Sequence, residues 1–440
     1  MKIVLKNGLI LDPSQNLEQV GSVVIVDDQI AQVGGEVDES DADEVYNCEG
    51  MWITPGLVDL HVHLREPGFS HKETILTGTQ SAAAGGFTTV CCMPNTSPPL
   101  DDPALIDFIL DKSASPEAGG VFVQPLGALT KGMKGERPSD LASLKRAGIC
   151  AASDDAFPVQ NAQVMLRCLE ICRQLDLPVA VHCEDLSLTH GGSMNDGAMS
   201  ELLGVTGMPR AAEDIMVARN CMLSLETGCP LHILHVSTWG AVEIIKQAKY
   251  LGAPVTCEVC PHHFSLTDED MPPFDPNWKM NPPLRTKVDV DIILQAIKDG
   301  TIDCISTDHA PHATYEKDAP LDEAPFGIVG LETAVGVTLT YLTHRGILSP
   351  LETVRMLSTR PAEVFRLDAG TLKPGRTPIA QVTVIDPDLE WTFDVTKTFS
   401  KGRNSPYDGR RFKGKTMLTF SGGNVYTDAL FNRERHSIGV

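Results

Sequence analysis

Two histidines, an acid and an arginine share one face of a short apolar stretch, VDLHVHLREPG, at residues 58–68. Because the side chains of a strand alternate between its two faces, Asp59, His61, His63 and Arg65 point to the side opposite the intervening aliphatic residues. Imidazole and carboxylate groups are ligands that zinc prefers, and the fork of an arginine suits a substrate carboxylate. The stretch therefore predicts one wall of a metal site that takes an acidic small molecule.

Four more candidate ligands close other apolar segments of the chain. They are Asp155 in AASDDA, His182 in VAVHCED, His235 in HILHVST and Asp308 in ISTDHAPH. A lone histidine at a strand end is usually a hydrogen-bonded core or rim residue, but a whole set of buried acids and imidazoles is costly without partners. Together with His61 and His63, the set predicts a site for one or two divalent ions.

The chemistry expected of such a site follows from the metal. A bound divalent ion lowers the pKa of water to about 7 and polarises a carbonyl. A nearby carboxylate can take the proton of that water and return it to a leaving nitrogen. Asp308 is the best candidate for this proton transfer, because it follows the last strand, which lies beside the first. The residues alone thus predict a metal-dependent hydrolase or cyclase that acts on an amide-like bond.

Eight apolar, strand-like stretches must position these side chains, and helical patterns separate most of them. The stretches are residues 56–64, 85–94, 119–129, 147–155, 177–185, 230–238, 253–261 and 301–309. Eight β–α alternations over roughly 250 residues are typical of an α/β protein with a (β/α)8 TIM barrel, whose active site lies at the carboxyl ends of the strands. A doubly wound sheet is the alternative, but no glycine-rich phosphate-binding fingerprint follows the first strand.

Both ends of the chain are rich in β-branched residues and turn signals. Such a pattern is typical of antiparallel strands. We expect residues 1–54 and 371–440 to pair into a small β-sandwich domain, and residues 55–370 to form the catalytic barrel.

Composition limits the partners and the compartment. A net charge of −22 argues against binding to nucleic acid. No run reaches the ~20 apolar residues of a membrane helix, and no secretory signal is visible. Twelve cysteines without such a signal indicate reduced thiols and a cytoplasmic protein. Cys257 and Cys260 have CxxC spacing, but they face opposite sides of a strand and lack a second pair, so a zinc knuckle is not expected.

The remaining histidines are given ordinary roles. His232 lies on the opposite strand face from His235, and His262 and His263 follow the seventh strand near the same rim, where they would have a supporting role. The others are expected to be solvated: His71, His190, His344 and His436.

Seven motifs together resemble the class I bacterial dihydroorotases of the amidohydrolase superfamily. They are DLHVHLREPG, TTVCCMPNTSP, SDD, VHCED, KMNPPLR, STDHAPH and APFGIVGLET. The resemblance implies a Zn²⁺-dependent, reversible cyclisation of N-carbamoyl-L-aspartate to L-dihydroorotate in pyrimidine (UMP) synthesis. The implied metal ligands are His61, His63, Asp155, His182, His235 and Asp308, with Asp308 also the catalytic acid and base. The implied substrate contacts are His63, Arg65, Asn95, Asn281 and His312, with backbone contacts near Phe326 and Gly327.

The fourth strand separates this chain from other relatives in that superfamily. Hydantoinases, dihydropyrimidinases and many allantoinases bridge two metals with a carboxylated lysine there, whereas here the matching position is Asp155, and Lys145 precedes the strand. Two departures from the pattern are Ala156, where glycine usually follows the aspartate pair, and Gln381, where the superfamily often has aspartate.

Two rival functions remain open: a non-catalytic scaffold for aspartate carbamoyltransferase, and another cyclic amidohydrolase of the hydantoinase or allantoinase type. The resemblance also leaves room for a homodimer and for an aspartate carbamoyltransferase partner of an active enzyme. Residues 313–325, ATYEKDAPLDEAP, are polar and contain prolines, which predicts a loop. That loop is either a lid over the substrate or a static surface segment.

Overall fold

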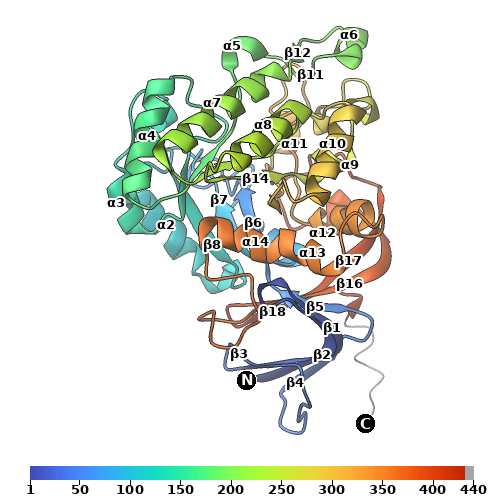
Figure 1. The fold of residues 1–440 in the computed structure, drawn as a ribbon. Coiled ribbons are helices and arrows are strands. Elements are labelled where there is room, and N and C mark those ends of the chain that lie inside the picture. The colour runs from blue at the N-terminus through green and yellow to red at the C-terminus, as the bar shows by residue number, and fades with distance from the viewer. Residues whose placement is uncertain (432–440) are drawn as a thin grey trace.

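Eight parallel strands form a barrel in the computed structural model, which describes residues 1–431 (Figure 1). The strands are β6 (Leu57–Val62), β7 (Phe87–Cys92), β8 (Phe122–Ala128), β9 (Ala151–Ser153), β10 (Val179–Val181), β13 (Leu231–Ile233), β14 (Val255–Val259) and β15 (Cys304–Ile305). They follow one another around the barrel in chain order. The amide of His63 donates to the carbonyl of His309 at 2.8 Å, which joins the first strand to the segment after the last. The predicted TIM barrel is confirmed.

Helices cover the outside of the barrel between successive strands (Figure 1). The longer ones are α1 (Ile75–Gly85), α2 (Pro103–Ser113), α3 (Leu141–Ala147), α4 (Ala162–Gln174), α7 (Ala211–Thr227), α8 (Trp239–Tyr250) and α10 (Lys287–Lys298). The shorter ones are α5 (Leu186–Thr189), α6 (Ala198–Leu203), α9 (Pro261–Ser265), α11 (Thr314–Lys317), α12 (Ala334–Thr338), α13 (Pro350–Val354) and α14 (Arg360–Phe365). A two-stranded sheet of β11 (Met194–Asn195) and β12 (Gly207–Met208) lies outside the barrel.

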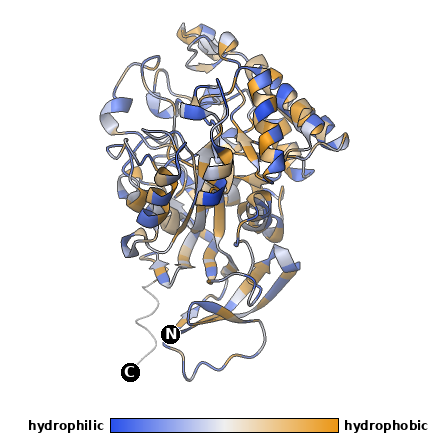
Figure 2. Ribbon diagram, turned by 90° about the vertical axis from the view of Figure 1, so that its left-hand side faces the viewer, coloured by the Kyte–Doolittle hydropathy of each residue, from blue (hydrophilic) through white to orange (hydrophobic). Residues whose placement is uncertain are grey.

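Helix α4 illustrates why these segments are helical. The Asn161 side chain caps its start by accepting from the amides of Gln163 and Val164. Its buried residues recur at the spacing of one helical face: Met165, Cys168, Leu169 and Cys172. Figure 2 shows hydrophobic and hydrophilic segments alternating along the helices around the barrel, as expected for helices that bury one face.

The two ends of the chain combine into the predicted small β domain, whose strands are joined in one continuous eight-stranded sheet. These strands are β1 (Lys2–Asp12), β2 (Leu17–Val26), β3 (Gln29–Val33), β4 (Glu44–Asn47), β5 (Trp52–Pro55), β16 (Gln381–Thr392), β17 (Arg411–Ser421) and β18 (Asn424–Thr427). Strand β5 pairs in parallel with β1 on one side and antiparallel with β16 on the other. A hydrophobic cluster of its own packs on this sheet, including Ile3, Ile53 and Val382. The exact domain boundaries stay a prediction, and residues 432–440, with His436, lie outside the described part.

Gln381 ties the small domain to the barrel. Its side-chain oxygen accepts from the hydroxyls of Thr88 and Thr89 on β7, at 3.0 and 2.9 Å. Its side-chain nitrogen donates to the carbonyl of Asp368 at 2.9 Å. An aspartate at this position could not make that last donation. The unusual glutamine therefore has a structural role, at the opposite end of the barrel strands from the candidate ligands.

No helix within residues 1–431 combines the length and the apolar character needed to span a membrane.

Candidate active site

The candidate bridging acid, Asp155, presents its two carboxylate oxygens to different pairs of histidines. Its Oδ2 lies 3.5 Å from His61 Nε2 and 3.5 Å from His63 Nε2. Its Oδ1 lies 3.7 Å from His235 Nε2 and 3.9 Å from His182 Nδ1. All five side chains are buried at the carboxyl ends of strands from different parts of the barrel. The arrangement contains two groups of potential metal ligands that share one carboxylate.

Asp308, from the segment after β15, completes the first of these groups. Its Oδ1 lies 3.0 Å from His63 Nε2 and 3.4 Å from His61 Nε2. Burial disfavours the charged carboxylate, but His61 and His63 hold the pKa of Asp308 below its ordinary value. In the other direction, burial disfavours the imidazolium, yet Asp308 and Asp155 raise the pKa of His61 well above its ordinary value. The centre therefore attracts positive charge.

Three of the four histidines are oriented by partners outside the cluster. His61 Nδ1 donates to Glu258 Oε1 at 2.9 Å, and His63 Nδ1 donates to Asn95 Oδ1 at 3.0 Å. His182 Nε2 donates to Glu184 Oε2 at 3.0 Å. Each ring then turns its other nitrogen toward the cluster, as in histidines that ligate metals.

The surroundings of His61 Nε2 show whether the cluster suits a bound metal ion. It is buried, it has no hydrogen-bond donor among the described residues, and it faces the carboxylates of Asp155 and Asp308. Without a metal, the raised pKa of His61 places a proton on Nε2 between the ring and these carboxylates, and a divalent cation can take the place of that proton. The donor set of imidazole nitrogens and carboxylate oxygens suits a divalent metal such as zinc.

Sequence reasoning missed the two glutamates that orient these rings. The Glu258 carboxylate lies within β14 and joins His61 to His232, whose Nε2 donates to it at 3.1 Å. Glu184 accepts from His182 and from the Asn281 side chain, the latter at 2.8 Å. Burial opposes the charge of Glu184, but His182 lowers its pKa to about 2. The available signal was an acid inside an apolar strand, VTCEV, and an acid two residues after a candidate ligand.

Two other acids lie near the site but turn away from it. Asp59 accepts from the amides of His61 and Thr307, at 3.0 and 3.2 Å, and burial raises its pKa to about 7. Asp154 accepts from the amide of Thr130 at 3.0 Å and from its hydroxyl. Neither lines the cavity above the cluster. Their contacts are those of acids that hold loops in place.

A cavity of about 150 Å³ opens above the cluster. Its walls include the following predicted contact residues: His63, Arg65, Asn95, Asn281, Phe326 and Gly327. Burial lowers the pKa of Arg65 to about 10, so its guanidinium stays charged at neutral pH. The cavity therefore joins a negative metal-type cluster to one fixed positive charge.

His312 does not line this cavity but lies behind Arg65. Its Nε2 donates to the carbonyl of Phe326 at 2.8 Å, and its Nδ1 accepts from Lys72 Nζ at 3.4 Å. Burial and the charges of Arg65 and Lys72 lower its pKa to about 2, so the ring is neutral. From this position His312 supports the wall formed by Phe326.

Several residues of the site have backbone angles that favour glycine. Positive φ values occur at Arg65 (64°), Ala156 (66°), His235 (34°) and Asp308 (49°). Such conformations cost of order 1–3 kcal/mol each and persist where the surrounding structure enforces them. Ala156 thus adopts the conformation for which the usual glycine at this position is suited.

The segment 313–325 contains the short helix α11, where the sequence predicted only a loop. The helix begins where Glu316 accepts from the amide of Ala313 at 3.0 Å. Buried Lys317 then donates to the carbonyls of Pro276 and Pro325, at 2.9 and 2.8 Å. These bonds hold the segment against the region before Asn281.

The histidines given ordinary roles divide as follows. His71, His190 and His344 are exposed, as predicted. His262 and His263 are buried, and His263 donates to the carbonyl of Pro282, the residue after Asn281. All twelve cysteines are free, and among the described residues no group of potential metal ligands contains both Cys257 and Cys260.

Comparisons with known proteins agree with this picture. A model of dihydro-orotase-like proteins matches residues 50–240. Dihydroorotases from Pelotomaculum thermopropionicum and Solibacter usitatus are 48% and 46% identical to the chain over 425 residues, which are 97% of this chain and 98% of each relative.

Solved structures show the same fold at lower identity. The L-hydantoinase from Arthrobacter aurescens aligns with a TM-score of 0.85 at 24% identity and covers 97% of this chain and 96% of its own. The dihydropyrimidinase from Brevibacillus agri aligns with a TM-score of 0.82 at 21% identity, over 97% and 95%. At this identity the likeness concerns the fold alone.

Proposed function

Because the chain belongs to the dihydroorotase family, we propose that it catalyses the reversible cyclisation of N-carbamoyl-L-aspartate to L-dihydroorotate, a step of UMP synthesis. The observation that carries the proposal is Asp155, whose two oxygens face separate histidine pairs below a cavity that Arg65 lines. The substrate is a dicarboxylate, and its product keeps one free carboxylate, which the single guanidinium can bind.

We place the enzyme in the aspartate-bridged, class I group. A carboxylated lysine bridge would need a lysine at the cavity, and none is found among the described residues that line it. Lys145 lies on α3 and donates to the carbonyl of Leu175, away from the site. This difference also argues against the hydantoinase-like and allantoinase-like alternatives.

One or two Zn²⁺ ions fit the donor set. His61, His63, Asp155 and Asp308 would hold one ion, and Asp155, His182 and His235 would hold the other. When bound, such an ion supplies a water of lowered pKa and polarises the carbonyl under attack.

The chain's own residues would perform the remaining steps. Arg65 binds the carboxylate that stays outside the ring and so orients the amide carbonyl toward the cluster. In hydrolysis, Asp308 accepts the proton of the attacking water and passes it to the ring nitrogen as the carbon–nitrogen bond breaks. In cyclisation, it takes a proton from the ureido nitrogen and returns it to the departing hydroxyl group.

Asn95 and Asn281 each have two roles in the proposed mechanism. Both line the cavity, and both also fix a ligand, Asn95 through His63 and Asn281 through Glu184. Phe326 and Gly327 contribute the wall that faces the substrate ring.

The cytoplasm is the proposed compartment, supported by the twelve free thiols. A homodimer and a complex with aspartate carbamoyltransferase stay proposals without a contact surface assigned to them. The rival scaffold function requires lost ligands, whereas all six candidate positions retain groups that can bind a metal.

Metal analysis combined with a dihydroorotate hydrolysis assay tests the proposal. We expect divalent metal in the purified chain and turnover in both directions; metal-bound protein without turnover in either direction would favour the scaffold. Asp155→Ala should lose metal and activity together. Asp154→Ala, its neighbour, should keep metal while weakening the turn at Thr130. Full activity in Asp155→Ala would mean that another carboxylate bridges.

We also propose that residues 313–325 close over the substrate as a lid, anchored by Lys317. Hydrogen exchange in this segment should slow when dihydroorotate is added to the wild type. Lys317→Met should remove the hydrogen bonds to the carbonyls of Pro276, Lys279 and Pro325 and raise exchange in the free state. Equal exchange with and without dihydroorotate would identify a static surface segment.

A further inference from the structure

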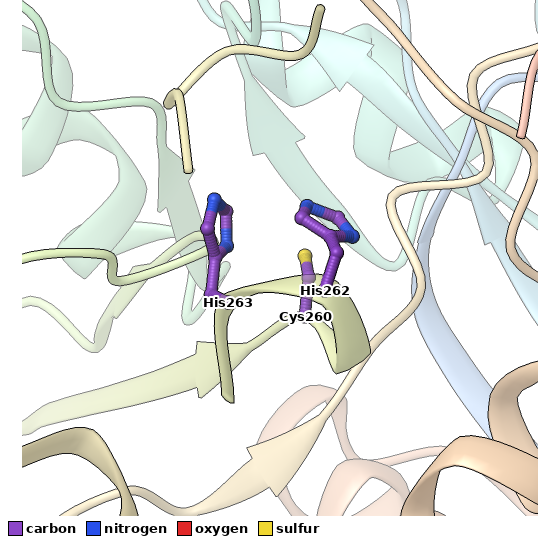
Figure 3. A group of neighbouring side chains, drawn as sticks. All are labelled: Cys260, His262 and His263. Atoms are coloured by element: carbon purple, nitrogen blue, oxygen red, sulfur yellow. The ribbon is translucent and has the colours of Figure 1, made fainter. Parts of the chain in front are cut away.

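We propose that Cys260, His262 and His263 form a separate binding site, beside the catalytic cavity, for one cation that binds sulfur ligands, such as Zn²⁺. Each residue offers a ligand atom, and these atoms all lie within 4.8 Å of one another. None of the three belongs to the six candidate ligands of the catalytic centre. Figure 3 shows the sulfur of Cys260 lying between the two imidazole rings.

The local fold explains why side chains so close in sequence converge. Strand β14 ends at Val259, and Cys260 is the extended residue before the single turn of α9. Pro261 stands at the first position of that turn, where its fixed φ favours helix initiation. The turn brings the two rings to a centroid separation of 4.2 Å.

His263 is already in the form that a metal requires. Its Nε2 lies 3.0 Å from the carbonyl of Pro282, and because a carbonyl only accepts, Nε2 carries the proton. Nδ1 is then an unprotonated lone pair, buried and without a hydrogen-bond partner among the described residues. A histidine that donates one nitrogen to a backbone carbonyl and turns the other to a metal is the usual arrangement in metal sites.

His262 presents a second unused nitrogen. Its Nε2 is buried and also lacks a hydrogen-bond partner within residues 1–431. Native proteins satisfy nearly all buried polar groups, so two orphaned nitrogens on adjacent residues call for a ligand. One cation would satisfy both.

The charge around the cluster also suits a cation. Burial lowers the pKa of His262 to about 4 and that of His263 well below its ordinary value, so both rings are neutral ligands. Burial and the nearby acids Asp308 and Glu258 raise the pKa of the Cys260 thiol. The thiol would release its proton to solvent as the cation binds. Thiolate and imidazole together select zinc or copper(I) over magnesium or calcium.

Cys257 supplies the matched control. It lies within β14, three residues before Cys260, and is equally buried, but its sulfur donates to the carbonyl of Thr301 at 3.4 Å. The CxxC spacing therefore does not make a two-cysteine site. Of these two cysteines, Cys260 alone belongs to a group of potential metal ligands with histidines among the described residues.

Cobalt substitution of the full-length chain tests the site apart from catalysis. A thiolate ligand gives Co²⁺ a charge-transfer absorption in the near ultraviolet, and the six catalytic candidates contain no sulfur. We expect the wild-type chain loaded with Co²⁺ to show this absorption. Cys260→Ala should lose it together with one equivalent of cobalt, and Cys257→Ala should keep both.

Absence of the absorption from wild type, or its persistence in Cys260→Ala, would overturn the proposal. The wild-type spectrum decides even if Cys260→Ala does not fold. His263→Gln offers a second variant, which should shift or weaken the absorption by removing one nitrogen ligand, and an unchanged spectrum would contradict the site. Dihydroorotate turnover by the zinc-loaded wild type is a separate readout, so failure of the proposed function and of this site are distinguishable.

Discussion

Glu258 Oε1 accepts a hydrogen bond from His61 Nδ1 at 2.9 Å, beneath the cluster of candidate metal ligands. The same carboxylate accepts from His232 Nε2 at 3.1 Å. Burial opposes its charge, but the two imidazoles hold the pKa of Glu258 far below its ordinary value. Glu258 is therefore a buried carboxylate that fixes which nitrogen of His61 is free.

Glu258→Gln should lower metal affinity about 10- to 100-fold, the effect typical of losing a partner that orients a metal-binding histidine. The neutral amide keeps the shape but removes the charge that favours a proton on His61 Nδ1. Competition with a chelator measures the change. Glu390→Gln is the control, because Glu390 is an exposed partner of Arg411 in the small domain. Unchanged affinity in Glu258→Gln would show that His61 needs no such support.

Arg65→Lys should reduce kcat/KM for dihydroorotate by roughly 10- to 100-fold, since hydrogen bonds to charged groups contribute about 1.5–3 kcal/mol. Lysine keeps the charge but lacks the two-pronged fork. Steady-state kinetics should assign the loss mainly to KM. Arg345→Lys, at a residue stacked on Tyr341, should leave the kinetics unchanged. A fall in kcat with constant KM would contradict the role of Arg65 as a carboxylate anchor.

Gly327→Ala should destabilise the cavity wall and lower activity. Gly327 has φ of 135°, and a Cβ there would stand 2.7 Å from the carbonyl oxygen of Ala310, closer than real Cβ atoms approach. Gly375→Ala separates the two effects, because Gly375 has φ of 70° but open space around it. Urea unfolding should show a loss of about 1–2 kcal/mol for Gly375→Ala, the cost of a left-handed alanine. An equal loss of unfolding free energy in both variants would mean that the cavity wall at Gly327 shifts to accommodate the added Cβ.

Glu332 should make stability depend on pH. Burial raises its pKa to about 7 from 4.5, although the Ser81 hydroxyl and the Phe399 amide both donate to it. Between pH 4.5 and 7 the folded state keeps a proton that the unfolded state has lost, so stability falls as pH rises through this window. The loss is at most ~3 kcal/mol by linkage. Urea unfolding from pH 4.5 to 8 measures it.

Glu332→Gln keeps the hydrogen-bonding shape and cannot ionise. The contribution of residue 332 to the slope of unfolding free energy against pH should therefore vanish. The variant should also be more stable than wild type at pH 8. Glu363→Gln, at an exposed partner of Arg360, should leave the slope intact. Parallel curves for wild type and Glu332→Gln would show that Glu332 is already ionised in the folded state.

The barrel was predictable because local signals agree with the fold. Each strand is a compact apolar run, and the glycines and prolines before most of them mark where helices stop. The candidate ligands followed from the barrel geometry alone, since its strands bring their carboxyl ends together.

The supporting contacts were not predictable in this way. Glu258 and His61 are 197 residues apart, and their pairing depends on where β14 meets β6 inside the barrel. The helix in 313–325 depends on one side-chain bond from Glu316, and the position of His312 depends on the carbonyl of Phe326. Such contacts are set by packing between distant segments, for which residue periodicity carries no signal.

Strand β5 lies between partners from opposite ends of the chain, and this has a consequence for synthesis on the ribosome. Its edge toward β16 stays unpaired until residues up to 385 have been made, because Val382–Ile385 are the residues of β16 that pair with it. At ~5–20 residues per second, that interval is on the order of 20 to 70 s. Throughout that interval, a short buried strand just before the candidate ligands His61 and His63 has an open edge. We therefore expect the nascent chain to need chaperones late in translation. For the same reason, a truncation that removes β16 would expose the strand at the start of the barrel and not only remove a peripheral domain.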